Sequence, residues 1–284
     1  MTVGYVALAL LSGVLLGVWK FGLSVYRGRV SGYATVLVSA SAAALGYVVI
    51  GSMMGSLAFD RRDVFAGFLG GACNLAGTLL LLEGYRRGKV GVVTGIAASC
   101  VLIPLAYSFA IGEPLSREKA VGVVVILAGM AAFYVGSMRV GREDPAVQPR
   151  TALLFALGAA LFWGVAIIVL DRGTLVSLTG ALTMSQVPQV TFTAAMVLLA
   201  TGSRAGVTGR AVAVIAAAGL ALALGNMAYF TAANEGDIGV VSVLGSLSPL
   251  VTALLAVAIL RERMSRVEWL ALGVVLAGTA LVAR

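Results

Sequence analysis

The sequence predicts an all-α integral membrane protein with ten transmembrane helices, arranged as two inverted repeats of five helices. Composition, the length of the apolar runs and an internal repeat all predict this fold. Hydrophobic residues make up 60% of the 284 residues and charged residues 11%, whereas a soluble domain has about 25% charged residues. The apolar runs are continuous and about 20 residues long, which suits helices that cross a bilayer and not the short alternating strands of a membrane β-barrel.

The charged residues indicate lipid headgroups, and not nucleic acid, as the surroundings of this chain. Its net charge is +8, from 20 Lys and Arg residues against 12 Asp and Glu residues. The basic residues stand in pairs and triplets between apolar runs, as in loops at a membrane surface, and form no stripe with interleaved aromatic residues. The chain has no histidine, and Cys73 and Cys100 lie inside apolar runs without the spacing of metal ligands. We therefore expect membrane lipids as partners, and no metal ion, cofactor or nucleic acid.

The apolar runs and the short polar segments between them define the helices, in steps of about 28 residues for one helix and its loop. No basic segment precedes Val3, so we expect the first run to be retained as a helix and not cleaved as a signal peptide. Charged or glycine-containing segments such as Arg86-Arg87-Gly88-Lys89 separate most of the others. The expected helices cover residues 4–26, 31–52, 64–84, 90–111, 117–137, 151–170, 176–201, 211–232, 238–260 and 266–283.

An internal repeat divides the chain into two halves, residues 1–137 and 151–284, joined by a polar linker over residues 138–150. Each half holds five of the expected helices, and an odd number places the second half in the membrane with the opposite orientation. Inverted repeats of this kind are typical of transporters, because two related bundles can rock about a shared site at the midplane. The matching segments are 88–93 with 236–241, 113–116 with 262–265, 127–129 with 276–278, and Gly77-Thr78 with Gly225-Asn226.

The ends of the two halves resemble the EamA-type repeat of the drug/metabolite transporter (DMT) superfamily. The first resembles it in the run Gly112-Glu113-Pro114-Leu115-Ser116, and the second from Ser248-Pro249-Leu250 through Glu262. The second half fits the pattern better, because Pro104 stands about one turn later relative to the following glutamate than Pro249 does. The resemblance covers both halves and implies ten helices and the transport of a small metabolite.

Polar stripes on several expected helices provide the candidate cargo-binding residues. Residues at positions i, i+3 or i+4, and i+7 share one face of a helix. Lipid cannot satisfy amides or charges, so such stripes are expected to face the interior of the bundle. An aromatic residue beside them could stack on a flat cargo. The candidates are Lys20, Asn74, Thr78, Trp163, Gln186, Gln189, Asn226, Tyr229 and Ser246.

Most of these candidates also have a purely structural interpretation, which the sequence leaves open. Small and hydroxyl residues let transmembrane helices approach closely, and asparagines such as Asn74 form hydrogen bonds between helices. Gln186 and Gln189 flank Pro188, so their amides could bind the backbone carbonyls that a proline frees. Trp163 could fill the core.

Lys20 is the only cation well within an apolar run, and it shares a stripe with Gly13 and Gly17. A lysine near the midplane costs a few kcal/mol, so an inward ammonium indicates a function, here the binding of a carboxylate or phosphate on the cargo. The alternative is that Lys20, about 9 Å from the end of its helix, reaches the interface. Glu83 points away from the stripe of Asn74 and is expected to be an interfacial charge.

The orientation in the membrane stays open at the sequence level, because two arguments disagree. With a cytoplasmic N-terminus, most of the loop Lys and Arg residues would lie outside, so the rule that basic loops stay inside favours both termini outside. The resemblance implies both termini inside. In either case we expect a multi-pass protein of the cytoplasmic (plasma) membrane of a prokaryote.

We therefore expect a secondary transporter that moves a small polar metabolite, amino-acid-like or an organic anion, by alternating access. The alternative is a flippase or exporter of a lipid-linked or hydrophobic compound. An enzyme is not expected, since the predicted interior offers neither histidine nor facing carboxylates. The small-residue faces of the fifth and tenth helices, Gly122/Gly129/Gly136 and Gly273/Ala277, suit either scaffold packing or a homodimer.

Overall fold

The computed structural model describes residues 2–110, 117, 120–122, 124–129, 131–132, 148–173, 176–199, 208–235, 248–262 and 264–282. All regular secondary structure in these ranges is helical. Each of the ten expected spans contains helix among the described residues, which confirms the all-α fold and the number of helices. Ser246 and most of the linker over 138–150 lie outside the described residues.

The helix boundaries agree with the apolar runs to within a few residues. Pro149 opens the first helix of the second half, a position where the missing N–H of proline has no helical partner to lose. The helices of the first half are α1 (Thr2–Ser24), α2 (Gly32–Met53), α3 (Arg61–Arg87), α4 (Val90–Ala97), the 3₁₀ turn η1 (Ala98–Val101) and α5 (Leu102–Ala110). Those of the second half are α7 (Pro149–Gly173), α8 (Leu178–Leu199), α9 (Gly209–Glu235), α11 (Ser248–Ile259) and α12 (Arg266–Val282).

The fourth expected helix, over residues 90–111, differs from the prediction because it is broken into α4, η1 and α5. Pro104 explains the break. Proline has no N–H to give to the carbonyl four residues earlier, and its ring collides with that carbonyl, which here belongs to Cys100. The backbone tightens into a 3₁₀ turn over Ala98–Val101, so the irregular segment covers the carbonyl that has lost its partner. By contrast, α8 stays helical through Pro188.

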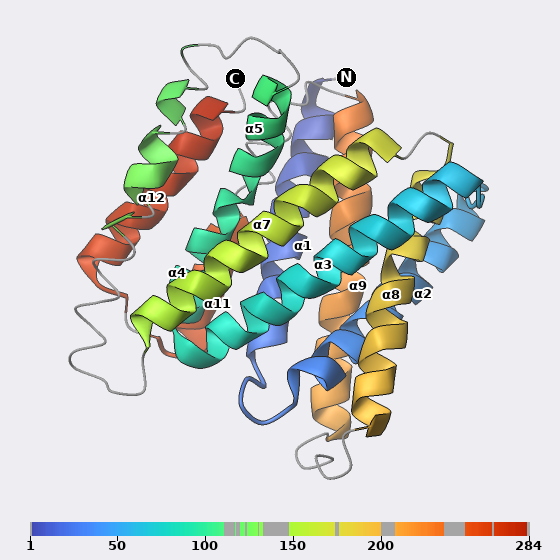
Figure 1. Ribbon diagram of the computed structural model, residues 1–284, viewed down its shortest axis with the longest axis horizontal. Helices are drawn as coiled ribbons and strands as arrows, with labels where there is room; N and C mark the ends of the chain where they lie inside the picture. Colours follow the sequence, from blue (N-terminus) through green and yellow to red (C-terminus); the bar gives the residue numbers. More distant parts are fainter. Residues whose placement is uncertain are drawn as a thin grey trace.

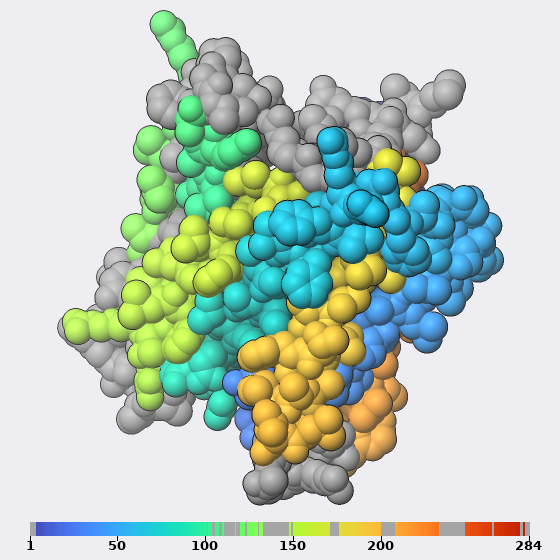
Figure 2. Space-filling view, turned by 45° about the vertical axis from the view of Figure 1, so that its right-hand side comes forward, coloured from blue at the N-terminus to red at the C-terminus, as the bar shows by residue number. Residues whose placement is uncertain are grey.

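Among the described residues, six helices are long and apolar enough to cross a membrane: α1, α2, α3, α7, α8 and α9. The outer surface over α2, α3, α7 and α8, shown in Figure 2, carries large apolar side chains. Phe65, Leu154 and Leu198 are 69%, 69% and 80% exposed. An apolar surface of this kind is stable only against lipid or another apolar partner, which agrees with the prediction of a membrane protein.

The two halves interlock and do not form separate lobes. In Figure 1, α3 runs beside α7 across the near face, and α1 lies beside α9. α3 also packs on α8, α2 packs on both α8 and α9, and α11 packs on α1 and α4. Each of these pairs joins a helix of the first half to a helix of the second. Both termini lie at one end of the bundle (Figure 1), as an even number of spans requires.

Two glycines on α3 allow α8 to approach it very closely. A Cβ atom at Gly67 would lie 2.3 Å from the carbonyl oxygen of Ala181, and one at Gly71 would lie 2.0 Å from that of Ser185. Glycines four residues apart that bring two backbones into contact are a common packing device of membrane helices. The same contact places α8, with its two glutamines, directly against α3.

The small-residue faces of the fifth and tenth expected helices meet each other within one chain. A Cβ at Gly129 would lie 2.7 Å from a side-chain atom of Val275, and one at Gly278 would lie 2.7 Å from the backbone nitrogen of Ile126. Gly273 faces open space among the described residues. Scaffold packing thus uses part of these faces, and a homodimer through them stays a prediction.

Candidate functional site

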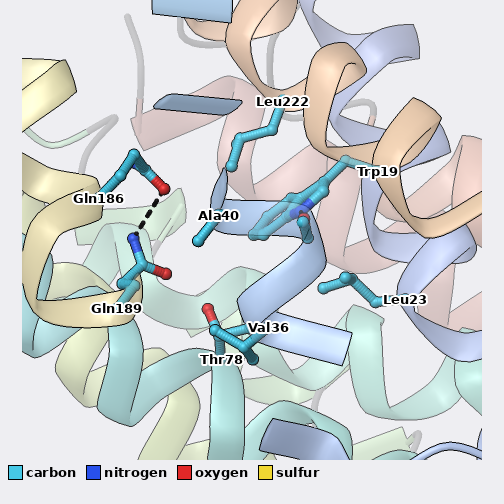
Figure 3. A pocket seen from close by; sticks show the side chains of 9 residues that line it. Trp19, Leu23, Val36, Ala40, Thr78, Gln186, Gln189 and Leu222 are labelled. Atoms are coloured by element: carbon cyan, nitrogen blue, oxygen red, sulfur yellow. Dashed lines mark hydrogen bonds between the residues drawn. The ribbon is translucent and has the colours of Figure 1, made fainter. Parts of the chain in front are cut away.

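A small cavity lined by both polar and apolar side chains lies where five helices from both halves meet (Figure 3). Its volume is about 10 Å³, close to the space that a single water molecule needs. The cavity is therefore too small to hold a metabolite in this conformation. It is lined by Trp19 and Leu23 of α1, Val36, Ser39 and Ala40 of α2, Thr78 of α3, Gln186 and Gln189 of α8, and Leu222 of α9.

Three of the predicted site residues contribute polar side chains to this cavity, in addition to Ser39 and Trp19. The hydroxyl of Thr78 is buried and has no hydrogen-bond partner among the described residues. The amide nitrogen of Gln189 donates to the side-chain oxygen of Gln186 at 3.1 Å, while the oxygen of Gln189 is directed into the cavity (Figure 3). A buried hydroxyl without a partner carries an energetic cost. A group of the cargo that bonds to it would remove that cost.

The two glutamines are also bonded within their own helix, as the structural interpretation expects. The side-chain amide of Gln189 donates to the backbone carbonyl of Ser185 at 3.1 Å, and that of Gln186 donates to the hydroxyl of Ser185 at 2.9 Å. The carbonyl that Pro188 leaves without a helical hydrogen bond belongs to Met184, which precedes Ser185. Neither glutamine amide binds that carbonyl, so neither bond replaces the one that the proline removes. Part of the hydrogen-bonding capacity of each amide therefore serves α8, and the rest faces the cavity.

Lys20 does not line this cavity but lies near it, next to Trp19 in the chain, and its side chain is directed towards helices of the second half. Its Nζ donates to Oγ of Ser248 on α11 at 3.0 Å and lies 5.2 Å from the centre of the Trp163 ring on α7. No carboxylate among the described residues lies within ion-pair distance of it. Glu83 is bonded to Arg86 and Arg87 of its own helix. The ammonium is therefore held by a hydroxyl and an aromatic face, and no anion among the described residues neutralises its charge.

Trp19 connects the two parts of the site. Its ring lines the cavity and lies 5.9 Å from the ring of Trp163, at an angle of 38°. Its Nε1 donates to Oγ of Ser39 at 3.2 Å. Nε1 of Trp163 is buried and has no hydrogen-bond partner among the described residues. Thr78, Gln186 and Gln189 thus face the cavity, and Trp163, which contacts both Trp19 and Lys20, connects the ammonium to it.

The remaining candidates lie apart from this centre. Asn226 on α9 donates to the hydroxyl of Tyr47 on α2 at 2.7 Å, a bond between two helices. Tyr229 packs edge-on against Phe230 with 5.3 Å between ring centres. It also contacts a small cluster of Ala9 and Ala232. Asn74 is half-buried on α3. The structure therefore gives Asn226 the interhelical bond that the alternative interpretation expected.

Replacing Tyr47 with phenylalanine should lower the free energy of unfolding by about 1 kcal/mol and leave cargo affinity unchanged. The change removes the hydroxyl that accepts the hydrogen bond of the Asn226 amide. Because Tyr47 is fully buried, water cannot easily replace that acceptor. Thermal unfolding in detergent, together with a binding titration, checks both parts. Tyr33→Phe, at an exposed position of the same helix, is the control. A loss of affinity without loss of stability would instead assign Tyr47 and Asn226 to the cargo site.

Charged residues join the two halves near one end of the bundle, and sequence reasoning did not find these contacts. Arg27 forms an ion pair with Glu262, and Lys89 forms one with Glu268. Glu268 is completely buried. The run from Ser265 to Glu268 has the spacing of a helix capping box, which marks a helix start in a sequence but does not identify an ion-pair partner.

At the other end, the halves meet through hydrogen bonds around the start of α8. The carboxylate of Asp63, at the start of α3, accepts from the backbone N–H of Ser177 at 2.6 Å and of Val176 at 3.1 Å. The hydroxyls of Ser177 and Thr179 both donate to the carbonyl of Ser56, at 2.7 and 2.9 Å. Contacts between the halves are thus present at both ends of the bundle.

A multi-span helical bundle with a polar centre enclosed between two interlocked halves has the architecture of membrane transporters. Residues 150–284, the second half of the chain, match the EamA-like transporter family, which confirms the predicted resemblance to EamA-type transporters of the DMT superfamily. The match identifies the protein as a membrane transporter. One solved structure, titled only as the crystal structure of a protein, is 19% identical with a TM-score of 0.66 and covers 97% of this chain and 96% of its own. That likeness confirms the fold alone. No curated protein matches the chain.

Proposed function

We propose that the protein is a secondary transporter that carries a small organic anion across the cytoplasmic membrane by alternating access of its two halves. The observation that carries this proposal is the ammonium of Lys20, which lies beside the central cavity without a carboxylate partner among the described residues. An uncompensated charge inside a membrane bundle is expensive, and such residues mark the pathways of ions and substrates.

The groups around the ammonium fit a cargo that is rich in hydrogen-bond acceptors. The hydroxyl of Thr78 and the indole N–H of Trp163 are buried without partners among the described residues, and both can donate. Lys20 uses one N–H on Ser248 and has two more. A carboxylate or phosphate supplies several acceptor lone pairs, so it suits these donors better than a cationic or purely apolar group does.

The small volume of the cavity supports a state in which the site is collapsed, between two open ones. A space of about 10 Å³ holds no metabolite, so binding requires the two halves to move apart at one end. Each end is held by contacts between the halves that can open without unfolding a helix. Alternating access needs these two properties, a central site and two ends that can separate.

The proposal is tested by a thermal-shift screen of the purified protein with carboxylates, phosphates, zwitterions, cations and lipid-linked compounds. A ligand that binds only the folded state adds about 2.7 kcal/mol of stability at a hundredfold excess over its Kd. We expect one class of carboxylates or phosphates to stabilise the protein, and the same compounds to exchange across liposomes that contain it. Stabilisation by cations alone would overturn the anion proposal. Stabilisation by lipid-linked compounds alone would favour a flippase or exporter.

A further inference from the structure

The first of the two ion pairs between the halves connects the loop after α1 to the loop after α11. Nη2 of Arg27 lies 2.9 Å from Oε1 of Glu262, which also accepts from the backbone N–H of Val90 at 3.2 Å. The side chain of Glu262 is 8% exposed, and its other oxygen is buried with no partner among the described residues. Among the described residues, Arg27 is therefore the one cation within ion-pair distance of Glu262.

The second ion pair connects the start of α4 to the first turn of α12. Nζ of Lys89 lies 2.9 and 3.1 Å from the two carboxylate oxygens of Glu268. Oε2 of Glu268 also accepts from the backbone N–H of Ser265 at 2.7 Å, and the hydroxyl of Ser265 accepts from the N–H of Glu268 at 3.3 Å. This reciprocal cap fixes the carboxylate at the helix start, so it faces Lys89 in one orientation.

Both pairs join a cation of the first half to a carboxylate of the second half. Glu268 and Glu262 are buried, so the loss of either cation would leave an uncompensated charge in a site of low dielectric constant. The closed arrangement therefore requires both partners of each pair. When the halves separate and water enters, all four groups become hydrated and no charge stays buried, so the pairs can alternate between a closed and an open arrangement.

These pairs lie between the Lys20 site and one face of the membrane. Arg27 follows Lys20 by seven residues, of which the first four complete α1 and span about 6 Å along its axis. The ends of α1, α3 and α11 and the start of α4 gather at this end of the bundle, opposite the end with the two termini (Figure 1). A separation of the halves here would open a path from the membrane surface to Lys20.

We propose that Arg27, Lys89, Glu262 and Glu268 form an ionic latch that closes the transport path at the end opposite the termini. When the latch opens, the Lys20 site becomes accessible from that side of the membrane. The inference rests on the proposed alternating access, but not on the identity of the cargo. The four residues act as gating residues and do not touch the cargo.

The latch is tested by measuring distances across both ends with spin labels, in lipid nanodiscs and without cargo. One labelled pair replaces the exposed residues Arg29 and Arg266 at the latch end, and a second replaces the exposed residues Phe59 and Val176 at the other end. Both are made in a protein with Cys73→Ala and Cys100→Ala. In the wild type, we expect about 10% of molecules or less to show the longer distance of an open latch end. In the variant Glu262→Gln/Glu268→Gln, the majority of molecules should show it.

Two further variants make the test specific. Glu83→Gln removes a carboxylate whose partners, Arg86 and Arg87, lie in the same helix, so it should leave both distances unchanged. Arg27→Glu/Glu262→Arg exchanges the two charges of one pair and should keep the latch end closed, whereas Arg27→Gln alone should open it. If the double glutamine variant does not fold, this comparison decides the same question.

An unchanged distance across the latch end in Glu262→Gln/Glu268→Gln and Arg27→Gln would overturn the latch. Equal opening by Glu83→Gln would overturn it as well, because any loss of charge would then suffice. A latch that opens in a protein without affinity for any anion would leave this inference intact and overturn the proposed cargo. Binding of an anion with no opening in any variant would overturn the latch alone.

Discussion

Replacing Lys20 with alanine is expected to weaken the binding of an anionic cargo by about ten- to a hundredfold. A hydrogen bond to a charged group contributes about 1.5–3 kcal/mol, and each 1.4 kcal/mol changes the Kd tenfold. Lys20 is the one cation beside the central cavity among the described residues, so no neighbour there takes over its role. Lys20→Arg keeps the charge and should retain part of the affinity, although its fork cannot reproduce the geometry of an ammonium.

The same substitution should not lower the stability of the empty protein. The ammonium has a hydroxyl and an aromatic face but no carboxylate among the described residues, and a charge of that kind inside a bundle is costly. Lys20→Ala should therefore leave the unfolding temperature unchanged or raise it. Isothermal titration and thermal unfolding measure the two effects. Arg86→Ala, which removes a positive charge at an exposed position, is the control. Unchanged affinity in Lys20→Ala would remove Lys20 from the mechanism.

Replacing Gly71 with alanine is expected to destabilise the protein by about 3 kcal/mol, at the upper end of the usual cost of overpacking. The added Cβ would lie 2.0 Å from the carbonyl oxygen of Ser185 and 2.6 Å from its carbonyl carbon. Both are backbone atoms, so no side chain can turn away, and α3 and α8 must move apart. Because Ser185 precedes Gln186, this movement also displaces the glutamine side chains of the cavity, and we expect cargo affinity to fall with stability.

Thermal unfolding and size-exclusion chromatography in detergent measure this effect. The matched control is Gly273→Ala in α12, where a Cβ would meet no atom within 4 Å. That variant should unfold within a degree or two of the wild type, since 1 kcal/mol corresponds to about 2–4 °C in a chain of this size. If Gly71→Ala were as stable as Gly273→Ala, the contact between α3 and α8 would not limit the stability of the bundle.

The fold could be predicted because its causes are local in the sequence. Apolar runs of the length of a bilayer define helices, and repeated short motifs divide the chain, so neither step needs knowledge of contacts. The break before Pro104 could also have been predicted from the sequence, because a proline disturbs the helical hydrogen bond to the residue four positions earlier. Pro188, which also lies inside an expected helix, leaves that helix continuous. A proline alone therefore does not tell whether a helix will break.

The site was predictable only in part, because its contacts join residues that are far apart along the chain. Helical spacing placed Thr78, Gln186 and Gln189 on inward stripes, and the structure brings them to one cavity. The same spacing could not show that Lys20 meets Ser248, 228 residues later, or that Asn226 bonds to Tyr47. Lys89 and Glu268 stand near helix ends, where charges are ordinary, so nothing in the sequence marks them as a buried pair.

The interlocking of the two halves has a consequence for biosynthesis. When the first five helices leave the ribosome and enter the membrane, α3 has neither α7 nor α8 beside it, and the groove at Gly67 and Gly71 faces lipid. The helices of the first half are then inserted in the membrane, but their main packing partners in the second half have not yet been translated. An interrupted chain therefore leaves a fragment that is embedded yet unassembled, and membrane proteases and insertion chaperones can distinguish it from the finished protein by that exposed groove.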